Sequence, residues 1–264
     1  DDEAIQAWYE SATPSSRGRP QRYSDLAITT VLVIKRVFRL TLRAAQGFID
    51  SIFSLMNVPL RCPDYSCVSR RAKSVNVSFK TPTRGEIAHL VIDSTGLKVF
   101  GEGKWKVKKH GQERRRIWRK LHLAVDSKTH EIICADLSLN NVTDSEAFPG
   151  LIRQTHRKIR SAAADGAYDT RLCHDELRRK KISALIPPRK GAGYWPGEYA
   201  DRNRAVANQR MTGSNARWKW TTDYNRRSIA ETAMYRVKQL FGGSLTLRDY
   251  DGQVAEAMAL VRAL

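Results

Sequence analysis

The sequence lacks an apolar run long enough to cross a bilayer, and it is poor in acidic residues. The longest apolar stretch near its start, AITTVLVI at 27–34, is interrupted by Lys35 and Arg36 and falls far short of the ~20 residues that a spanning helix needs. Only 27 Asp and Glu residues stand against 46 Lys and Arg residues, which gives a formal net charge of +19. This excess favours a polyanion, so we expect a nucleic-acid-binding protein without membrane contact.

Cysteine and histidine patterns typical of metal or disulfide frameworks are also absent. The four cysteines show no C-x-x-C spacing and the six histidines form no H-E-x-x-H, which argues against a zinc site or a disulfide scaffold. No secretory signal is visible, so we expect a cytoplasmic protein with reduced thiols. The sequence begins DDEAIQAWYE without methionine, and we allow for a further segment before Asp1.

The N-terminal third is predicted to be helical. Residues 1–23 are expected to form an N-terminal segment that ends in a polar linker, TPSSRGRPQRY. Ser24 and Thr41 are placed to cap two helices, because a hydroxyl side chain at this position accepts from the free N–H groups of the first turn. The three predicted helices lie at about 24–38, 41–56 and 65–75.

The last of these helical segments is basic. Three helices with a basic last one are typical of a helix-turn-helix-like module that reads DNA, whereas the same pattern also fits a plain bundle whose basic residues form a solvated face. We assign residues 24–80 to a small all-α DNA-binding domain. The expected DNA contacts are Arg70, Arg71 and Lys73.

From His89 the sequence becomes apolar and β-branched. The patterns predict strands at 89–100, 116–126, 131–139, 158–165 and 182–188, with helices at 145–158, 170–181 and 223–242. This β-β-β-α-β-α-β order before a closing helix predicts an α/β fold, a mixed sheet flanked by helices. Residues 189–222 are expected to form a Gly- and Arg-rich connector.

Two aspartates stand out on the predicted strands. Asp93 lies within LVIDSTG, in the most apolar strand, and Asp165 ends another strand in SAAADGAY. Each alone fits a loop or turn cap, but a buried acid is costly unless it is paired or bound to a metal. With Glu231 on the closing helix, three converging carboxylates would repel one another. Divalent cations relieve this repulsion, and oxygen ligands alone indicate Mg²⁺ or Mn²⁺.

The segment at 223–242, DYNRRSIAETAMYRVKQLFG, is predicted to be one helix with a polar functional face and an apolar face. At ~100° per residue, Tyr224, Arg227, Glu231 and Lys238 would share a sector of ~60° beside an apolar stripe. Taken alone, Arg227 and Glu231 form an ordinary i,i+4 surface pair of little energetic weight.

Together these residues resemble the DDE transposases of bacterial insertion sequences, which have a ribonuclease-H-like catalytic domain. The similarity is to the insertion-sequence-five family, in the branch of insertion sequence nine-hundred-and-three. The family motif Tyr-x2-Arg-x3-Glu-x6-Lys is met at every position, and DSTG and ADGAYD match its two aspartate motifs. The resemblance covers roughly residues 20–260, and the family's extreme N-terminal segment and some C-terminal residues are not in this sequence.

The resemblance implies a transposase whose catalytic, ribonuclease-H-like domain spans residues 81–264. Asp93, Asp165 and Glu231 would bind two Mg²⁺ ions per site, with Mn²⁺ as a substitute. These ions would drive hydrolysis at the terminal inverted repeats and attack of the 3′-hydroxyl on target DNA. The DNA end would be held by Tyr224, Arg227 and Lys238. A homodimer or larger assembly is expected, because two ends must be joined.

Two alternatives to a transposase remain open from the residues. The first is a structure-selective nuclease or resolvase of the same chemistry, and the second is an inactive DNA-binding derivative. A further basic stretch, GKWKVKKHGQERRRIWRK, suits a ribbon laid along a DNA backbone, and a merely solvated hairpin fits it as well. Its expected DNA contacts are Lys104, Lys106 and Lys108.

Overall fold

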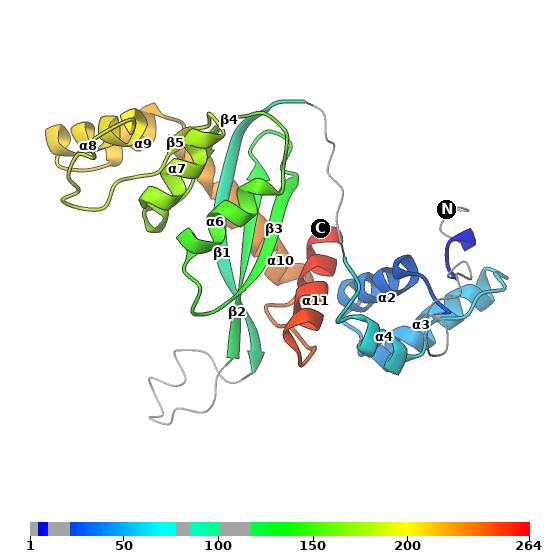
Figure 1. Ribbon diagram of the computed structural model, residues 1–264. Coiled ribbons are helices and arrows are strands. Elements are labelled where there is room, and N and C mark those ends of the chain that lie inside the picture. The colour runs from blue at the N-terminus through cyan, green and yellow to red at the C-terminus, as the bar shows by residue number, and fades with distance from the viewer. Residues whose placement is uncertain (1–4, 10–21, 78–84, 101–116) are drawn as a thin grey trace, which may run out of the picture. The chain divides into compact units, whose positions relative to one another are not determined.

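The computed structural model describes the chain in four stretches, residues 5–9, 22–77, 85–100 and 117–264. Its residues group into two compact units, which Figure 1 shows with their elements labelled. A helical unit combines Asp1–Phe79 with Val237–Leu264, and a sheet unit comprises Lys80–Arg236. No helix among the described residues is long and apolar enough to cross a bilayer.

The three helices predicted near the N-terminus are present. They are α2 (Asp25–Val37), α3 (Leu42–Leu55) and α4 (Tyr65–Arg71). The predicted caps are confirmed, since the Ser24 hydroxyl accepts from the Ala27 N–H and the Thr41 hydroxyl accepts from the Ala44 N–H, each at 3.2 Å. These bonds satisfy donors that the first turn of a helix leaves free.

A fourth helix, α11 (Tyr250–Arg262), completes the helical unit and was not predicted. Its Ala255 and Ala259 belong to one buried apolar cluster with residues of α2, α3 and α4, among them Ile28, Leu32, Ile49 and Val68. The last residues of the chain therefore pack with the N-terminal helices, whereas the sequence placed them in a single range of 81–264. The assignment of 24–80 and 81–264 as functional domains stays a prediction.

A buried ion pair lies inside this helical unit. Glu256 is fully buried and accepts from Lys35 Nζ at 2.7 Å and from Arg36 Nη1 at 2.9 Å. Burial alone raises the pKa of Glu256, but the two cations outweigh burial, so this pKa lies below its usual value. The two cations that interrupt the apolar stretch of α2 thus have a specific buried partner.

The sheet unit contains a five-stranded mixed sheet, as the sequence predicted. Its strands are β1 (Ile87–Phe100), β2 (Ile117–Asp126), β3 (Ile132–Leu139), β4 (Ile159–Ala163) and β5 (Ser183–Leu185). The order is β3-β2-β1-β4-β5, with β1, β2 and β3 antiparallel and with β4 parallel to both β1 and β5. This topology is ribonuclease-H-like.

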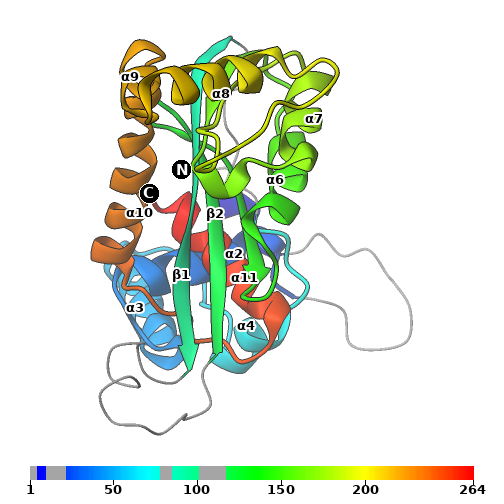
Figure 2. The same cartoon turned by 90° about the vertical axis from the view of Figure 1, so that its left-hand side faces the viewer.

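Helices cover both faces of this sheet (Figure 2). On one face lie α6 (Asp144–Arg153) and α7 (Arg171–Arg179), and α10 (Ser228–Phe241) lies on the other. Leu90 and Ile92 of β1 share a buried cluster with Phe148 and Leu151 of α6. Because side chains alternate along a strand, the residues between them, such as Val91 and Asp93, face α10.

The predicted connector at 189–222 is wrong in part, because it contains two helices, α8 (Ala200–Thr212) and α9 (Ala216–Thr221). Asp201 of α8 accepts from Ser183 Oγ at 2.8 Å and from the Ala184 N–H at 3.1 Å. These bonds satisfy donors of the edge strand β5, which a sheet edge otherwise leaves unpaired. The sequence of α8 shows only weak amphipathic patterning, so its tertiary contact with β5 stabilises the helix.

Candidate active site

The parallel pairing of β1 with β4 places two acids at matching positions. Val91 of β1 pairs with Ala163, the last residue of β4. Asp93 lies two residues further along β1, and Asp165 lies two residues beyond the end of β4. The two carboxylates interact electrostatically, since Asp165 raises the pKa of Asp93. The juxtaposition that the sequence predicted for these two aspartates therefore follows from strand register.

Asp93 is anchored through both carboxylate oxygens. Its Oδ1 accepts from the Ser94 N–H at 2.8 Å, and its Oδ2 accepts from Arg227 Nη1 at 2.8 Å. Burial raises the pKa of Asp93, Asp165 adds to the rise, and the Ser94 N–H and Arg227 oppose it. The net pKa lies above the usual value, as expected for a half-buried acid beside a second acid.

Asp165 follows β4 directly and caps the short 3₁₀ helix η1 (Gly166–Tyr168). Its Oδ1 accepts from the Ala167 N–H at 2.9 Å. The chain thus ends a strand and turns at the acid, which leaves the carboxylate at the carboxyl end of β4. Ligand-binding side chains gather at such strand ends in α/β sheets.

Arg227 connects two of the three predicted acids. Its guanidinium pairs with Asp93 through Nη1 and with Glu231 through Nη2. The Arg227 and Asp93 side chains are each 20% exposed, whereas Glu231 is 56% exposed. A planar guanidinium has several donors and can hold two carboxylates at once. The structure therefore joins Asp93 and Glu231 through Arg227, and Asp165 is near enough to help raise the pKa of Arg227.

The prediction of one continuous helix over 223–242 is wrong at its start. Tyr224–Arg227 form a 3₁₀ turn, η2, and the α-helix α10 begins only at Ser228. Asp223, just before this turn, has a left-handed backbone with φ of 58°. Side chains three residues apart lie one above the other in a 3₁₀ turn, so Tyr224 and Arg227 still point to the same side of the chain. Arg227 reaches the acids from the turn that precedes the helix.

Tyr224 and Lys238 lie in contrasting surroundings. Tyr224 is only 6% exposed and packs against Trp218, with ring centroids 5.6 Å apart. Burial raises the pKa of the Tyr224 hydroxyl to about 12. Lys238 is exposed on α10, seven residues after Glu231.

The donor chemistry of the three acids fits a hard divalent cation, since only carboxylate oxygens are offered. Among the described residues, however, no group of three or more His, Cys, Asp and Glu side chains is gathered closely enough to hold a metal ion. Arg227 stands between Asp93 and Glu231 and supplies the positive charge there. The acids thus fit a metal in kind, while the charges of Asp93 and Glu231 are paired with Arg227.

The other predicted DNA contacts are scattered. Arg70 is exposed on α4, and Lys73 is exposed and lies 3.5 Å from Asp249. Arg71 donates to the Tyr23 carbonyl at 2.9 Å and pairs with Asp25, so its charge is already used within the helical unit. Lys104, Lys106 and Lys108 lie outside the described residues.

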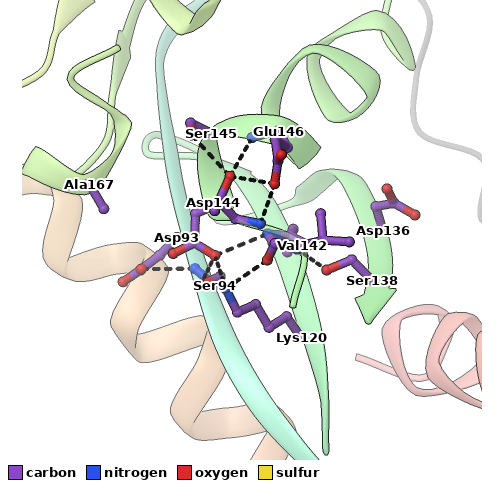
Figure 3. A network of polar contacts seen from close by, with 12 residues as sticks. Asp93, Ser94, Lys120, Asp136, Ser138, Val142, Asp144, Ser145, Glu146 and Ala167 are labelled. Carbon is purple, nitrogen blue, oxygen red and sulfur yellow. Dashed lines mark hydrogen bonds and ion pairs between the residues drawn. The ribbon is translucent and has the colours of Figure 1, made fainter. Parts of the chain in front are cut away.

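Three residues beside Asp93 were missed by sequence reasoning: Ser94, Lys120 and Asp144 (Figure 3). An Asp at the start of a helix most simply suggests an N-cap, but the cap of α6 is Thr143. The signal was available in the sequence. Thr143 and Glu146 have the spacing of a capping box, which leaves the Asp144 carboxylate free for other partners.

Two further aspartates of the sheet unit, Asp126 and Asp169, pair with other groups. Asp126 accepts from the Lys128 N–H at 2.9 Å in the turn after β2. Asp169 is buried and pairs with Arg202 Nε at 2.7 Å. Both therefore serve local structure.

Comparison with known proteins gives two family matches and distant structural similarities. A family model described as "Transposase DDE domain" matches residues 84–264, and a second one with the same description matches residues 1–102. The chain is similar to a piggyBac transposase synaptic complex with hairpin DNA, at 11% identity over 99% of this chain and 69% of that chain, with a TM-score of 0.44. It is also similar to a pre-cleavage Mos1 transpososome, at 12% identity over 96% of this chain and 80% of that chain, with a TM-score of 0.27. Because both TM-scores are low, the assignment rests on the family matches.

Proposed function

The chain belongs to the transposase DDE domain family, and from this premise we propose that it moves a bacterial insertion sequence of the insertion-sequence-five family. The family implies a metal-dependent enzyme that cleaves and joins DNA. In our proposal the protein binds the terminal inverted repeats, cleaves at the element ends and joins the 3′-hydroxyl ends to target DNA. The observation that carries the proposal is the grouping of Asp93, Asp165 and Glu231 around Arg227.

The three acids are proposed as the ligands of two Mg²⁺ ions, for which Mn²⁺ can substitute. When bound, such a pair of ions activates a water or hydroxyl and stabilises the leaving oxygen of a phosphodiester. Asp93 and Asp165 hold their places through strand register, and Glu231 offers an exposed carboxylate from the first turn of α10. The rigid sheet fixes two ligands and the helix supplies the third.

Arg227 has two proposed partners in turn. Without DNA it neutralises Asp93 and Glu231. On binding an element end it would turn its guanidinium to a phosphate, for which Arg is a strong bidentate donor. Lys238 would add a second phosphate contact from the same helix. Tyr224 is largely buried, so we assign it mainly to fixing the turn that carries Arg227.

Recognition of the element ends is proposed for the helical unit. Arg70 is the exposed basic residue on α4, and residues that contact base edges carry sequence information while phosphate contacts only position the DNA. A homodimer or larger assembly is proposed because two ends must be joined. The net charge of +19 supports DNA as the partner.

Purified Asp93→Asn, Asp165→Asn and Glu231→Gln variants test the proposal with labelled element ends and Mg²⁺. Each should lose cleavage and joining while DNA binding remains, because each loses a metal ligand but no phosphate contact. Asp175→Asn is the control, since Asp175 is a partly exposed acid of α7 whose partners are Arg178 and Tyr199. Near-normal cleavage by any triad variant would falsify that ligand.

The same assay separates the two alternatives. A structure-selective nuclease would cleave without giving strand-transfer products from linear donor DNA. An inactive derivative would bind element ends and leave them intact with either Mg²⁺ or Mn²⁺.

A further inference from the structure

Asp144 begins helix α6, but its carboxylate does not cap that helix. The cap is Thr143, whose hydroxyl accepts from the Glu146 N–H at 3.3 Å while Glu146 Oε2 accepts from the Thr143 N–H at 2.7 Å. Asp144 Oδ1 instead accepts from Ser94 Oγ at 3.0 Å and from Lys120 Nζ at 3.3 Å (Figure 3). The Asp144 carboxylate at the start of α6 thus binds side chains of β1 and β2 and not the N–H groups of its own helix.

The link through Ser94 leads directly to a proposed metal ligand. Ser94 is the residue whose backbone N–H donates to Asp93 Oδ1 at 2.8 Å. Neighbouring side chains of a strand point to opposite faces, so Ser94 reaches Asp144 on the α6 face while Asp93 reaches Arg227 on the α10 face. One residue therefore joins a network on one face of the sheet to the acid on the other.

Lys120 makes this network rigid. Its ammonium donates to the Val142 carbonyl at 2.8 Å as well as to Asp144. The side chains of Lys120 and Asp144 are 25% and 24% exposed, so solvent screens this pair less than a pair on an open surface. These contacts hold the start of α6 against β1 and β2, at the residue of β1 that follows Asp93.

A buried tyrosine responds to Asp144 and to the two proposed aspartate ligands. Tyr168 is 1% exposed, and its hydroxyl has no hydrogen-bond partner among the described residues. Burial raises the pKa of Tyr168 most, and Asp144, Asp93 and Asp165 follow in that order. Tyr168 is therefore a buried side chain that all three acids influence.

We propose that Asp144 is a positioning residue for the reaction, which through Ser94 fixes the orientation of the Asp93 carboxylate. This inference rests on the proposed function, because it takes Asp93 to be a metal ligand. A displacement of ~1 Å at a reacting centre can lower a rate by ~100-fold. Loss of the Ser94 anchor should therefore weaken both metal binding and cleavage without changing DNA contacts.

The test compares Ser94→Ala, Ser94→Thr, Asp144→Ala and the Ser94→Ala/Asp144→Ala double variant. Three quantities are measured: single-turnover cleavage of element ends, affinity for the same DNA, and Mn²⁺ affinity of the DNA-free protein by electron paramagnetic resonance. Glu146→Ala is the matched control, because it removes the capping box of the same helix without touching Ser94.

Ser94→Ala and Asp144→Ala should each slow cleavage by about 10- to 100-fold and weaken Mn²⁺ binding, with DNA affinity unchanged. The double variant should lose little more than either single one, since both break one coupled contact. Ser94→Thr keeps a hydroxyl and should restore much of the rate. If Asp144→Ala does not fold, Ser94→Ala still tests the inference, because it removes only the hydroxyl oxygen.

Wild-type cleavage and Mn²⁺ affinity in Ser94→Ala would overturn the inference, as would an equal loss in Glu146→Ala. Asp93→Asn in the same series separates this outcome from failure of the proposed function. Active Asp93→Asn refutes the metal-ligand role itself. Inactive Asp93→Asn beside a normal Ser94→Ala refutes only the positioning role of Asp144.

Discussion

The Arg227 guanidinium lies 2.8 Å from Asp93 Oδ2, across 134 residues of sequence. The same guanidinium also pairs with Glu231 four residues later. A residue proposed to clamp DNA therefore neutralises two proposed metal ligands when DNA is absent. Binding of DNA and binding of metal should favour each other, because a phosphate that draws Arg227 away frees both carboxylates, and such coupling is reciprocal.

Arg227→Ala should raise the Mn²⁺ affinity of the DNA-free protein, because Asp93 and Glu231 lose their positive partner. The same variant should cleave element ends ~100-fold more slowly, since the scissile phosphate is no longer held in place. Arg227→Lys should recover only part of the rate, because Lys lacks the planar fork. Paramagnetic resonance and single-turnover cleavage measure the two effects. Arg226→Ala is the control, and an unchanged Mn²⁺ affinity in Arg227→Ala would exclude the competition.

Affinity for DNA should depend steeply on salt. With a net charge of +19, 6 to 10 phosphate contacts are expected, and raising salt from ~50 to ~200 mM should weaken binding by roughly 10³- to 10⁵-fold. Fluorescence anisotropy with a labelled element end measures this slope. A flat response would mean that the basic residues do not contact phosphates.

Glu256→Ala should lower the free energy of unfolding by about 3–5 kcal/mol, because it removes the carboxylate that neutralises the buried charges of Lys35 and Arg36. Glu256 is fully buried, and the side chains of Lys35 and Arg36 are 4% and 6% exposed. Urea titration followed by circular dichroism measures the loss. The contrasting pair is Lys73 with Asp249, which is much more exposed, so Lys73→Ala should cost less than about 1 kcal/mol. Equal costs would refute the importance of the buried pair.

His122 should make the protein less stable in mild acid. Its ring is 1% exposed and lies 2.8 Å from Ser138 Oγ, and burial lowers its pKa to about 4 from an ordinary 6.5, with Asp144 opposing this fall. The unfolded chain therefore takes up this proton first. The contribution of neutral His122 to the free energy of unfolding is complete above pH 6.5 and is lost as the pH falls toward 4. The full loss is about 3 kcal/mol.

The measurement for His122 is urea unfolding between pH 7.5 and 5, together with the ring resonances of His122 by nuclear magnetic resonance. His122→Gln should show a smaller loss of stability over this range, because it has no proton to gain. A His122 ring that titrates near pH 6.5 in the folded protein would contradict the assignment.

Local patterns in the sequence were sufficient for the elements that depend on neighbouring residues. Ser24 and Thr41 cap their helices as predicted, because a cap needs only the first turn of the same helix. Apolar, β-branched and alternating runs predict the first three strands, and the five-stranded mixed sheet follows from the order of strands and helices. The motifs around Asp93, Asp165 and Glu231 indicated the family because each is a short stretch of sequence that can be recognised without the fold.

Tertiary structure decided every feature that joins distant residues. An apolar, β-branched run places Asp93 on a strand, but only the sheet register sets it beside Asp165, and only the fold brings Arg227 to it. Ser94 and Asp144 are 50 residues apart, so no local pattern could pair them. Helix α11 packs with α2 because Glu256 and its apolar neighbours find buried partners there. The free energy of such contacts depends on the burial and charge of residues that become neighbours only when the chain folds.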